Sequence, residues 1–129
     1  KLCKETPLPI ALDEELIGIV DQEKKNYLME AIQPQYIILK PSLHGGITGC
    51  MEWIALADQT KAGWWVTSAL ESNIGLSAIA QFAAKMNVNM PQGLGTGNLY
   101  QENIPSPLVL KGDQLRYDPN LRFDFSVLK

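Results

Sequence analysis

Four short segments of the chain each end in a group that could take part in chemistry. Asp13 follows one apolar run, Lys40 follows a second, and the hydroxyl pair Thr67 and Ser68 follows a third. The glycine-rich loop Gly95–Gly97 follows a weaker fourth run. A carboxylate can bind a hard cation, and hydroxyl, amide and ammonium groups can hold or stabilise an anion. Together these groups could bind a cation and stabilise a negative charge.

The spacing of these groups indicates a repeated structural unit. Asp13, Lys40, Ser68 and Gly95 are separated by 27, 28 and 27 residues. One βαβ step, with its strand, helix and loops, takes about 30 residues. Regular alternation of strands and helices predicts α/β architecture, in which the carboxyl ends of parallel strands share one rim. We therefore expect the four groups to meet at one rim.

The pattern of apolar residues predicts the elements that carry these groups. Tyr36–Leu39 and Trp64–Val66 are continuously apolar, as in parallel strands covered on both faces, while Leu8–Leu12 and Val88–Leu94 are less regular strand candidates. Helical periodicity marks the segments between them. It is found in Gln22–Ile32, in the set Cys50, Trp53, Ile54 and Ala57, and in the set Leu76, Ile79, Ala80 and Ala83. Four such units are about half of a (β/α)8 barrel, which needs about 250 residues. A small four-unit open sheet is the alternative.

The residues around the four strand ends resemble known motifs. Pro9–Glu14, Leu39–Gly46, Thr67–Leu76 and Gly93–Gly97 are similar, in order and spacing, to the fifth to eighth strand ends of o-succinylbenzoate synthases, a family of the enolase superfamily. The resemblance covers about residues 7–118. It implies the C-terminal half of an enolase-type (β/α)8 TIM barrel, with strands 5–8 and their helices.

The tail has a different pattern. Leu108–Leu110 and Leu115–Tyr117, separated by a Lys-Gly-Asp turn, predict a β-hairpin, and the alternating stretch Phe123–Leu128 predicts a further antiparallel strand. We expect a half-barrel over residues 1–104 and a hairpin tail over 105–129, packed on an N-terminal part outside this chain.

The resemblance also implies a function and a set of roles. It implies a Mg²⁺-assisted lyase of menaquinone synthesis, which removes a proton next to a carboxylate and then dehydrates its small-molecule substrate. Asp13 would be a Mg²⁺ ligand, and Lys40 would stabilise the enediolate. The substrate would be held by Thr67, Ser68, Gly95, Thr96 and Gly97. Glu14 would point to the opposite face if the strand continued, and it would support the metal ligand from behind, whereas Glu71 would position its neighbours through the backbone.

The resemblance places other required groups outside this chain. The base, a lysine on the second strand, and the metal ligands of the third and fourth strands would lie upstream of Lys1. The chain also starts without Met. We therefore expect it to be part of a longer protein and to be inactive on its own. The alternatives are a dipeptide epimerase or muconate-type cycloisomerase of the same superfamily, or a non-catalytic half-barrel. Exposed sheet edges predict that such a half-barrel forms homo-oligomers or pairs with its N-terminal half.

Composition excludes several other classes. The net charge is −3 with scattered basic residues, which argues against nucleic acid, and the apolar runs are too short to span a membrane. Cys3 and Cys50 fit no metal spacing, and with no signal peptide visible we expect a reduced, cytoplasmic protein. His44 has no ligand partner nearby and is expected to be a loop residue. The pattern Gly93-x-Gly95-x-Gly97 fails the dinucleotide fingerprint, because its third glycine comes one residue early.

Overall fold

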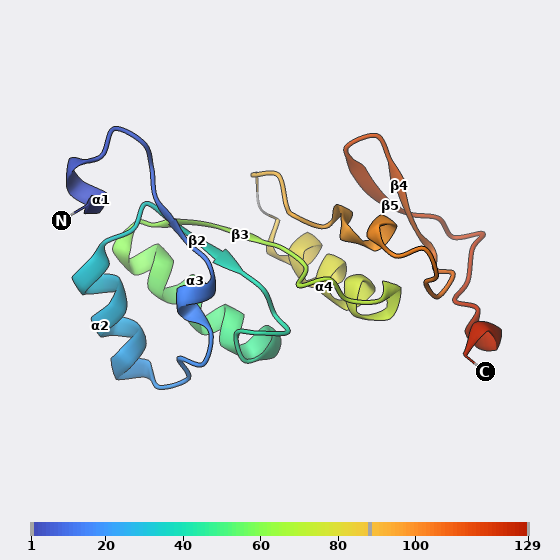
Figure 1. The fold of residues 1–129 in the computed structure, drawn as a ribbon, viewed down its shortest axis with the longest axis horizontal. Helices are drawn as coiled ribbons and strands as arrows, with labels where there is room; N and C mark the ends of the chain where they lie inside the picture. Colours follow the sequence, from blue (N-terminus) through green and yellow to red (C-terminus); the bar gives the residue numbers. More distant parts are fainter. Residues whose placement is uncertain (1, 88, 129) are drawn as a thin grey trace. The chain divides into compact units, whose positions relative to one another are not determined.

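The computed structural model describes residues 2–87 and 89–128 (Figure 1). Contacts between residues divide the chain into two compact units, Lys1–Ala69 and Leu70–Lys129. The first unit contains α1 (Leu2–Glu5), β1 (Ala11–Leu12), η1 (Glu14–Leu16), α2 (Gln22–Ile32), β2 (Tyr36–Leu39), α3 (Gly46–Thr60) and β3 (Gly63–Val66). The second contains α4 (Asn73–Met86), η2 (Gly95–Leu99), β4 (Leu108–Lys111), β5 (Gln114–Tyr117) and η3 (Phe125–Val127). Each unit is described by itself.

The first unit is built on a parallel sheet in the order β1-β2-β3. Ala11 pairs with Tyr36 across β1 and β2, and Leu39 pairs with Val66 across β2 and β3. Helices connect successive strands, as parallel pairing requires. The predicted strands Tyr36–Leu39 and Trp64–Val66 are confirmed, whereas β1 begins at Ala11 and not at the predicted Leu8, because Pro7 and Leu8 form a bend and Pro9 has no backbone N–H for strand pairing.

The helices of this unit bury the apolar faces that their periodicity predicted. Helix α2 begins after Asp21, whose side chain accepts a hydrogen bond from Lys24 N–H at 3.0 Å. It ends at Gln33, which has a left-handed φ of 54°. Helix α3 contacts α2, β2 and β3 (Figure 1). Its residues Cys50, Trp53, Ile54 and Ala57 are all buried. They form the core of this unit with Met29, Ile37, Leu39 and Val66.

The second unit combines α4 with an antiparallel hairpin. Leu76, Ile79 and Ala83 on α4 are buried, as predicted. In the hairpin, Leu108 pairs with Tyr117 and Lys111 pairs with Gln114. The two-residue loop between them begins with Gly112 at φ 62°, the conformation that a type II′ turn requires of its first position. The predicted hairpin is therefore confirmed.

Two strand predictions are wrong or incomplete in this unit. Of the predicted strand Val88–Leu94, Val88 lies outside the described residues, and residues 89–94 form no strand element. The stretch Phe123–Leu128 is not a strand either, because it contains η3. Asp124 accepts a hydrogen bond from Ser126 N–H at 2.9 Å, and such local side-chain bonds compete with strand pairing. The boundary predicted between residues 104 and 105 stays a prediction.

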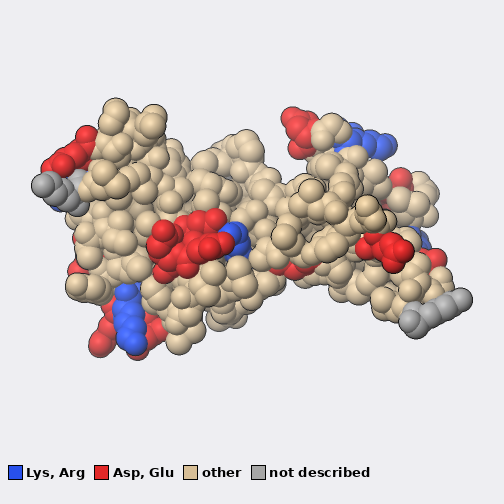
Figure 2. All heavy atoms as spheres, viewed as in Figure 1, with Lys and Arg blue, Asp and Glu red and all other residues tan. Residues whose placement is uncertain are grey.

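Three further observations bear on the excluded classes. Among the described residues, the helices are too short and too polar for any of them to cross a bilayer. Lys and Arg side chains form no continuous patch on the face drawn in Figure 2. Cys3 and Cys50 are buried free thiols, and burial raises the pKa of Cys50 to about 12.

Candidate active site

The parallel sheet brings three of the predicted groups to one edge. Strands β1, β2 and β3 end at Leu12, Leu39 and Val66 and run in the same direction. Asp13, Lys40 and Thr67 each follow directly, so all three lie at the carboxyl edge of the sheet. Thr67 N–H also donates to Leu39 O at 2.9 Å, which ties the ends of the second and third strands together.

An ion pair joins the first two groups. Lys40 Nζ lies 2.8 Å from Asp13 Oδ1 and 3.8 Å from Glu14 Oε1. The Lys40 side chain is 14% exposed and that of Asp13 is 36% exposed, so the lysine is largely shielded from bulk water and the carboxylate is shielded in part. Charges interact more strongly in such a place than at an open surface. The expectation that Asp13 and Lys40 point to one end of the sheet is confirmed.

Glu14 differs in placement from the expectation for a continuing strand. The strand ends at Leu12 and Glu14 opens η1, so its carboxylate comes within 3.8 Å of the Lys40 ammonium instead of pointing to the opposite face. The Glu14 side chain is 78% exposed. Glu15, which no motif marked, accepts a hydrogen bond from Asp13 N–H at 2.9 Å. That bond, together with one from its own N–H, lowers the pKa of Glu15.

His44 is the residue at this edge whose contacts the sequence did not predict. It lies in the turn after Lys40, as expected of a loop residue, but it is only 4% exposed. Its Nδ1 accepts a hydrogen bond from Lys40 N–H at 3.0 Å. Burial lowers the pKa of His44; the Lys40 charge adds to this lowering and the Asp13 charge opposes it. The only signal in the sequence was its position four residues after the strand-end lysine.

The hydroxyl pair sits at the end of β3. Ser68 is 5% exposed, and Thr67 Oγ1 donates to Ser68 O at 3.4 Å. The backbone N–H of Thr67 is bonded to Leu39, the last residue of β2. The two hydroxyl residues therefore lie next to the strand end that Lys40 follows. They are hydrogen-bonding groups of the type that holds a carboxylate.

The remaining predicted residues belong to the second unit. Gly95 and Thr96 begin η2, and Gly97 O accepts a hydrogen bond from Asn103 Nδ2 at 3.2 Å. A Cβ at Gly97 would lie 2.8 Å from Asn73 Oδ1 and 2.9 Å from Leu76 Cδ2. Gly97 therefore allows η2 to pack closely on the first turn of α4.

Glu71 precedes that helix and is packed against it. A Cβ at Gly75 would lie 2.8 Å from Glu71 Cβ, so the Glu71 stem rests on the first turn of α4. This close packing fixes the position of the Glu71 Cβ, from which its carboxylate extends. It agrees with a supporting role, which stays a prediction.

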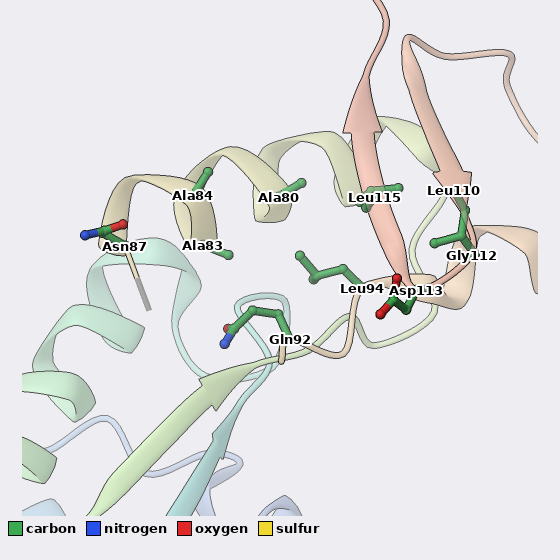
Figure 3. A pocket seen from close by; sticks show the side chains of 11 residues that line it. Ala80, Ala83, Ala84, Asn87, Gln92, Leu94, Leu110, Gly112, Asp113 and Leu115 are labelled. Atoms are coloured by element: carbon green, nitrogen blue, oxygen red, sulfur yellow. The ribbon is translucent and has the colours of Figure 1, made fainter. Parts of the chain in front are cut away.

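The second unit also contains a pocket of about 580 Å³ (Figure 3). It is lined by α4, by the segment before η2 and by the hairpin. Ala80, Ala83, Leu94 and Leu115 supply apolar surface, and Asp113 is the only charged side chain among the described residues that line it. Of the predicted site residues, Gly95 alone contributes to it. The pocket therefore offers apolar surface without the groups that the proposed chemistry needs.

Asp13 is the residue that could hold a metal ion. Within residues 2–87 and 89–128, no cluster of three or more His, Cys, Asp or Glu side chains is arranged to bind one. The buried Oδ1 of Asp13 has the Lys40 ammonium as its one close partner among the described residues. A carboxylate oxygen is the donor type that Mg²⁺ prefers, usually one or two per ion. The chain therefore fits as the source of one ligand and not of a whole site.

Comparison with known proteins shows which proteins this chain resembles. No family model matches the chain. It is 56% identical over 114 residues to an o-succinylbenzoate synthase of Desulfotalea psychrophila, covering 88% of this chain and 31% of that protein. The crystal structure of MenC from Desulfotalea psychrophila LSv54 superposes with a TM-score of 0.84 at 56% identity, over 88% of this chain and 32% of that one.

More distant structures share the same fold. A muconate cycloisomerase variant superposes with a TM-score of 0.79 at 25% identity, over 98% of this chain and 36% of its own. The chain thus spans about a third of the length of the relatives it matches. The strand-end motifs and these superpositions indicate the same superfamily. The chain is homologous to o-succinylbenzoate synthases and corresponds to the C-terminal part of an enolase-superfamily barrel protein.

Proposed function

We propose that the intact protein containing this chain is an o-succinylbenzoate synthase-like lyase of menaquinone synthesis. It would remove a proton next to a carboxylate of a hydroxy-cyclohexadiene substrate and then eliminate water. The observation that carries the proposal is the shielded Lys40–Asp13 pair at the carboxyl edge of the parallel sheet, in a chain 56% identical to such a synthase. Catalytic groups of (β/α)8 proteins lie at this edge.

Lys40 would stabilise the charge that forms on the substrate. Its side chain is 14% exposed, and a fixed positive charge in a shielded site stabilises an enediolate more strongly than water does. Asp13 would give one oxygen ligand to Mg²⁺. The bound ion would add further stabilisation of the same negative charge. Glu14, near the ammonium and exposed, would support the arrangement through its charge.

The hydroxyl and amide groups would orient the substrate. Thr67 and Ser68 follow the strand next to Lys40 and would donate hydrogen bonds to a carboxylate. Gly95, Thr96 and Gly97 would present backbone N–H groups to a second carboxylate, and Glu71 would keep its neighbours in place. Orienting a carboxylate by hydrogen bonds fixes the carbon next to it, which loses its proton.

Other groups would come from parts of the barrel that this chain does not contain. The relatives are about three times longer, and the resemblance to o-succinylbenzoate synthases implies that a second-strand lysine acts as the base. The third and fourth strands would complete the metal site. We therefore expect the isolated chain to show no dehydration activity.

Two alternatives remain distinguishable. A cycloisomerase or dipeptide epimerase would share the fold, as the muconate cycloisomerase superposition shows for the fold itself. A self-associating structural module is the non-enzymatic alternative. In the described sheet β1 and β3 are the outer strands, and open strand edges promote pairing with another chain. Size-exclusion chromatography of the isolated chain tests this, because a stable monomer would argue against it.

The decisive experiment is a substrate comparison on the intact protein with a lysine substitution. We expect dehydration of the cyclohexadiene substrate to exceed turnover of dipeptides and muconate. Lys40→Met should lower that activity at least about a hundredfold, because it removes the stabilising charge. Lys24→Met, which changes an exposed lysine of α2, is the matched control. Preferred turnover of dipeptides or muconate would reject the synthase assignment in favour of the corresponding relative.

A further inference from the structure

His44 and Lys40 are joined by two hydrogen bonds that run in opposite directions. Lys40 N–H donates to His44 Nδ1 at 3.0 Å, and His44 N–H donates to Lys40 O at 3.0 Å. Leu43 N–H also donates to Lys40 O, at 2.9 Å. The backbone N–H and C=O of the strand-end lysine are therefore both satisfied by the turn that follows it.

This bonding replaces strand pairing at the point where the strand stops. Residue 40 lies just beyond β2, and Pro41, which follows it, restricts Lys40 to extended backbone. The His44 ring is the hydrogen-bond partner of Lys40 N–H, and a shielded N–H that loses its partner is destabilising. The imidazole thus holds the backbone N–H of Lys40, the residue whose side chain reaches Asp13.

Three glycines allow the turn around His44 to close. Gly45 and Gly46 have φ values of 82° and 73°, which glycine adopts without strain. A Cβ at Gly49 would overlap the His44 carbonyl oxygen, so the first turn of α3 rests directly on the backbone of residue 44. His44 is 4% exposed. Three glycines therefore allow the chain to fold His44 back beneath Lys40.

We propose that His44 is a positioning residue for Lys40, whose imidazole fixes the backbone from which the Lys40 ammonium reaches Asp13. The inference rests on the proposed function, since it gives His44 a part in the reaction through Lys40. For Nδ1 to accept a hydrogen bond, the ring proton must be on Nε2. His44 itself touches neither Asp13 nor substrate in this account; it acts by keeping the ammonium in place.

A matched pair of substitutions in the intact protein tests the proposal. Asn and Leu have nearly the same shape, but only Asn has an oxygen that can replace Nδ1 as the acceptor. We expect His44→Asn to keep kcat within about threefold. His44→Leu should lower kcat about ten- to hundredfold with little change in KM, because the ammonium is misplaced while substrate binding remains. Thermal unfolding of both variants shows whether they are folded at the assay temperature.

Equal kcat values for two folded variants would overturn the proposal. Lys40→Met, assayed in parallel, distinguishes the role of Lys40 in the reaction from the role of His44 in positioning Lys40. Full activity of Lys40→Met would reject the role of Lys40 itself, whereas an inactive Lys40→Met with equal His44 variants would reject only the positioning role.

A second measurement decides the matter if His44→Leu does not fold. In the unsubstituted intact protein labelled with ¹⁵N in Lys and His, the proposed bond should give a scalar coupling between Lys40 N and His44 Nδ1 across the hydrogen bond. The His44 nitrogen shifts should also report a proton on Nε2. A proton on Nδ1, or no coupling, would overturn the proposal whatever the activity of the variants.

Discussion

Lys40 Nζ and Asp13 Oδ1 lie 2.8 Å apart although 27 residues separate them in the chain. One complete βαβ step brings them together, since β1 and β2 are adjacent parallel strands. The acid that would bind a cation and the amine that would stabilise an anion thus neutralise one another in the described chain. A bound Mg²⁺ would compete with Lys40 for the same oxygen.

Asp13→Asn in the intact protein should raise the Mg²⁺ concentration needed for half-maximal activity by about tenfold or more. The amide keeps the shape of the side chain but loses the charge that a hard cation prefers. Activity measured across a Mg²⁺ titration gives the midpoint. Asp58→Asn, the same change at an exposed position of α3, should leave the midpoint unchanged. A midpoint that does not move in Asp13→Asn would remove this residue from the metal site.

Stability should fall in mildly acidic solution because of His44. Its pKa is lowered by burial, so between the ordinary value of 6.5 and the lower folded value the unfolded chain binds a proton that the folded chain does not. The contribution is fully present above 6.5 and is lost as the pH falls through the folded pKa. Urea unfolding of the intact protein at about pH 7.5 and pH 5.5 measures it. His44→Asn, which cannot titrate, should show a smaller drop, and equal drops would contradict the prediction.

Gly97→Ala should destabilise the protein by about 1–3 kcal/mol, as expected for overpacking. The new methyl group would lie 2.8 Å from Asn73 Oδ1 and 2.9 Å from Leu76 Cδ2. Gly95→Ala is the control in the same short helix, since its methyl group would meet only Leu110 Cδ2, at 3.9 Å. The difference in unfolding free energy between the two variants is the measurement. Equal stabilities would show that η2 does not pack on α4 as described.

The buried ammonium of Lys25 should make Glu52 important for stability. Lys25 Nζ lies 2.5 Å from Glu52 Oε2 and 5.3 Å from the centre of the Trp53 ring, and its side chain is 2% exposed. Glu52→Gln leaves that charge without its counter-ion and should cost about 1–3 kcal/mol, less than for a fully buried pair because Glu52 is 46% exposed. Lys25→Met combined with Glu52→Gln should recover most of the loss. A double variant as unstable as Glu52→Gln alone would contradict this account.

The elements that the sequence predicted best were those with a strong local signal. The limits of α2 follow from Asp21 as the helix cap and from the apolar periodicity after it. The continuous apolar run Tyr36–Leu39 forms β2, in which Ile37 and Leu39 are buried and Tyr36 and Ile38 are half-buried. The alignment of Asp13 and Lys40 followed from strand direction, which the spacing of the motifs already implied.

The features that were missed depend on contacts that no local pattern encodes. The end of β1 at Leu12 was predicted, but nothing near Glu14 indicated the short helix η1 that follows, which turns Glu14 toward Lys40. The bond from Lys40 N–H to His44 Nδ1 depends on how tightly the turn closes on α3. In the tail, apolar alternation was outweighed by the Asp124 cap, which favours η3 over a strand.

The contact between Gly49 and the His44 carbonyl limits how this part of the barrel can change. Because α3 rests on the turn that follows β2, adding or deleting one residue between Pro41 and Gly45 would move the helix as well as the lysine. The length of the turn after β2 therefore determines how α3 packs on the sheet, so this turn can change in length only if the helix also moves.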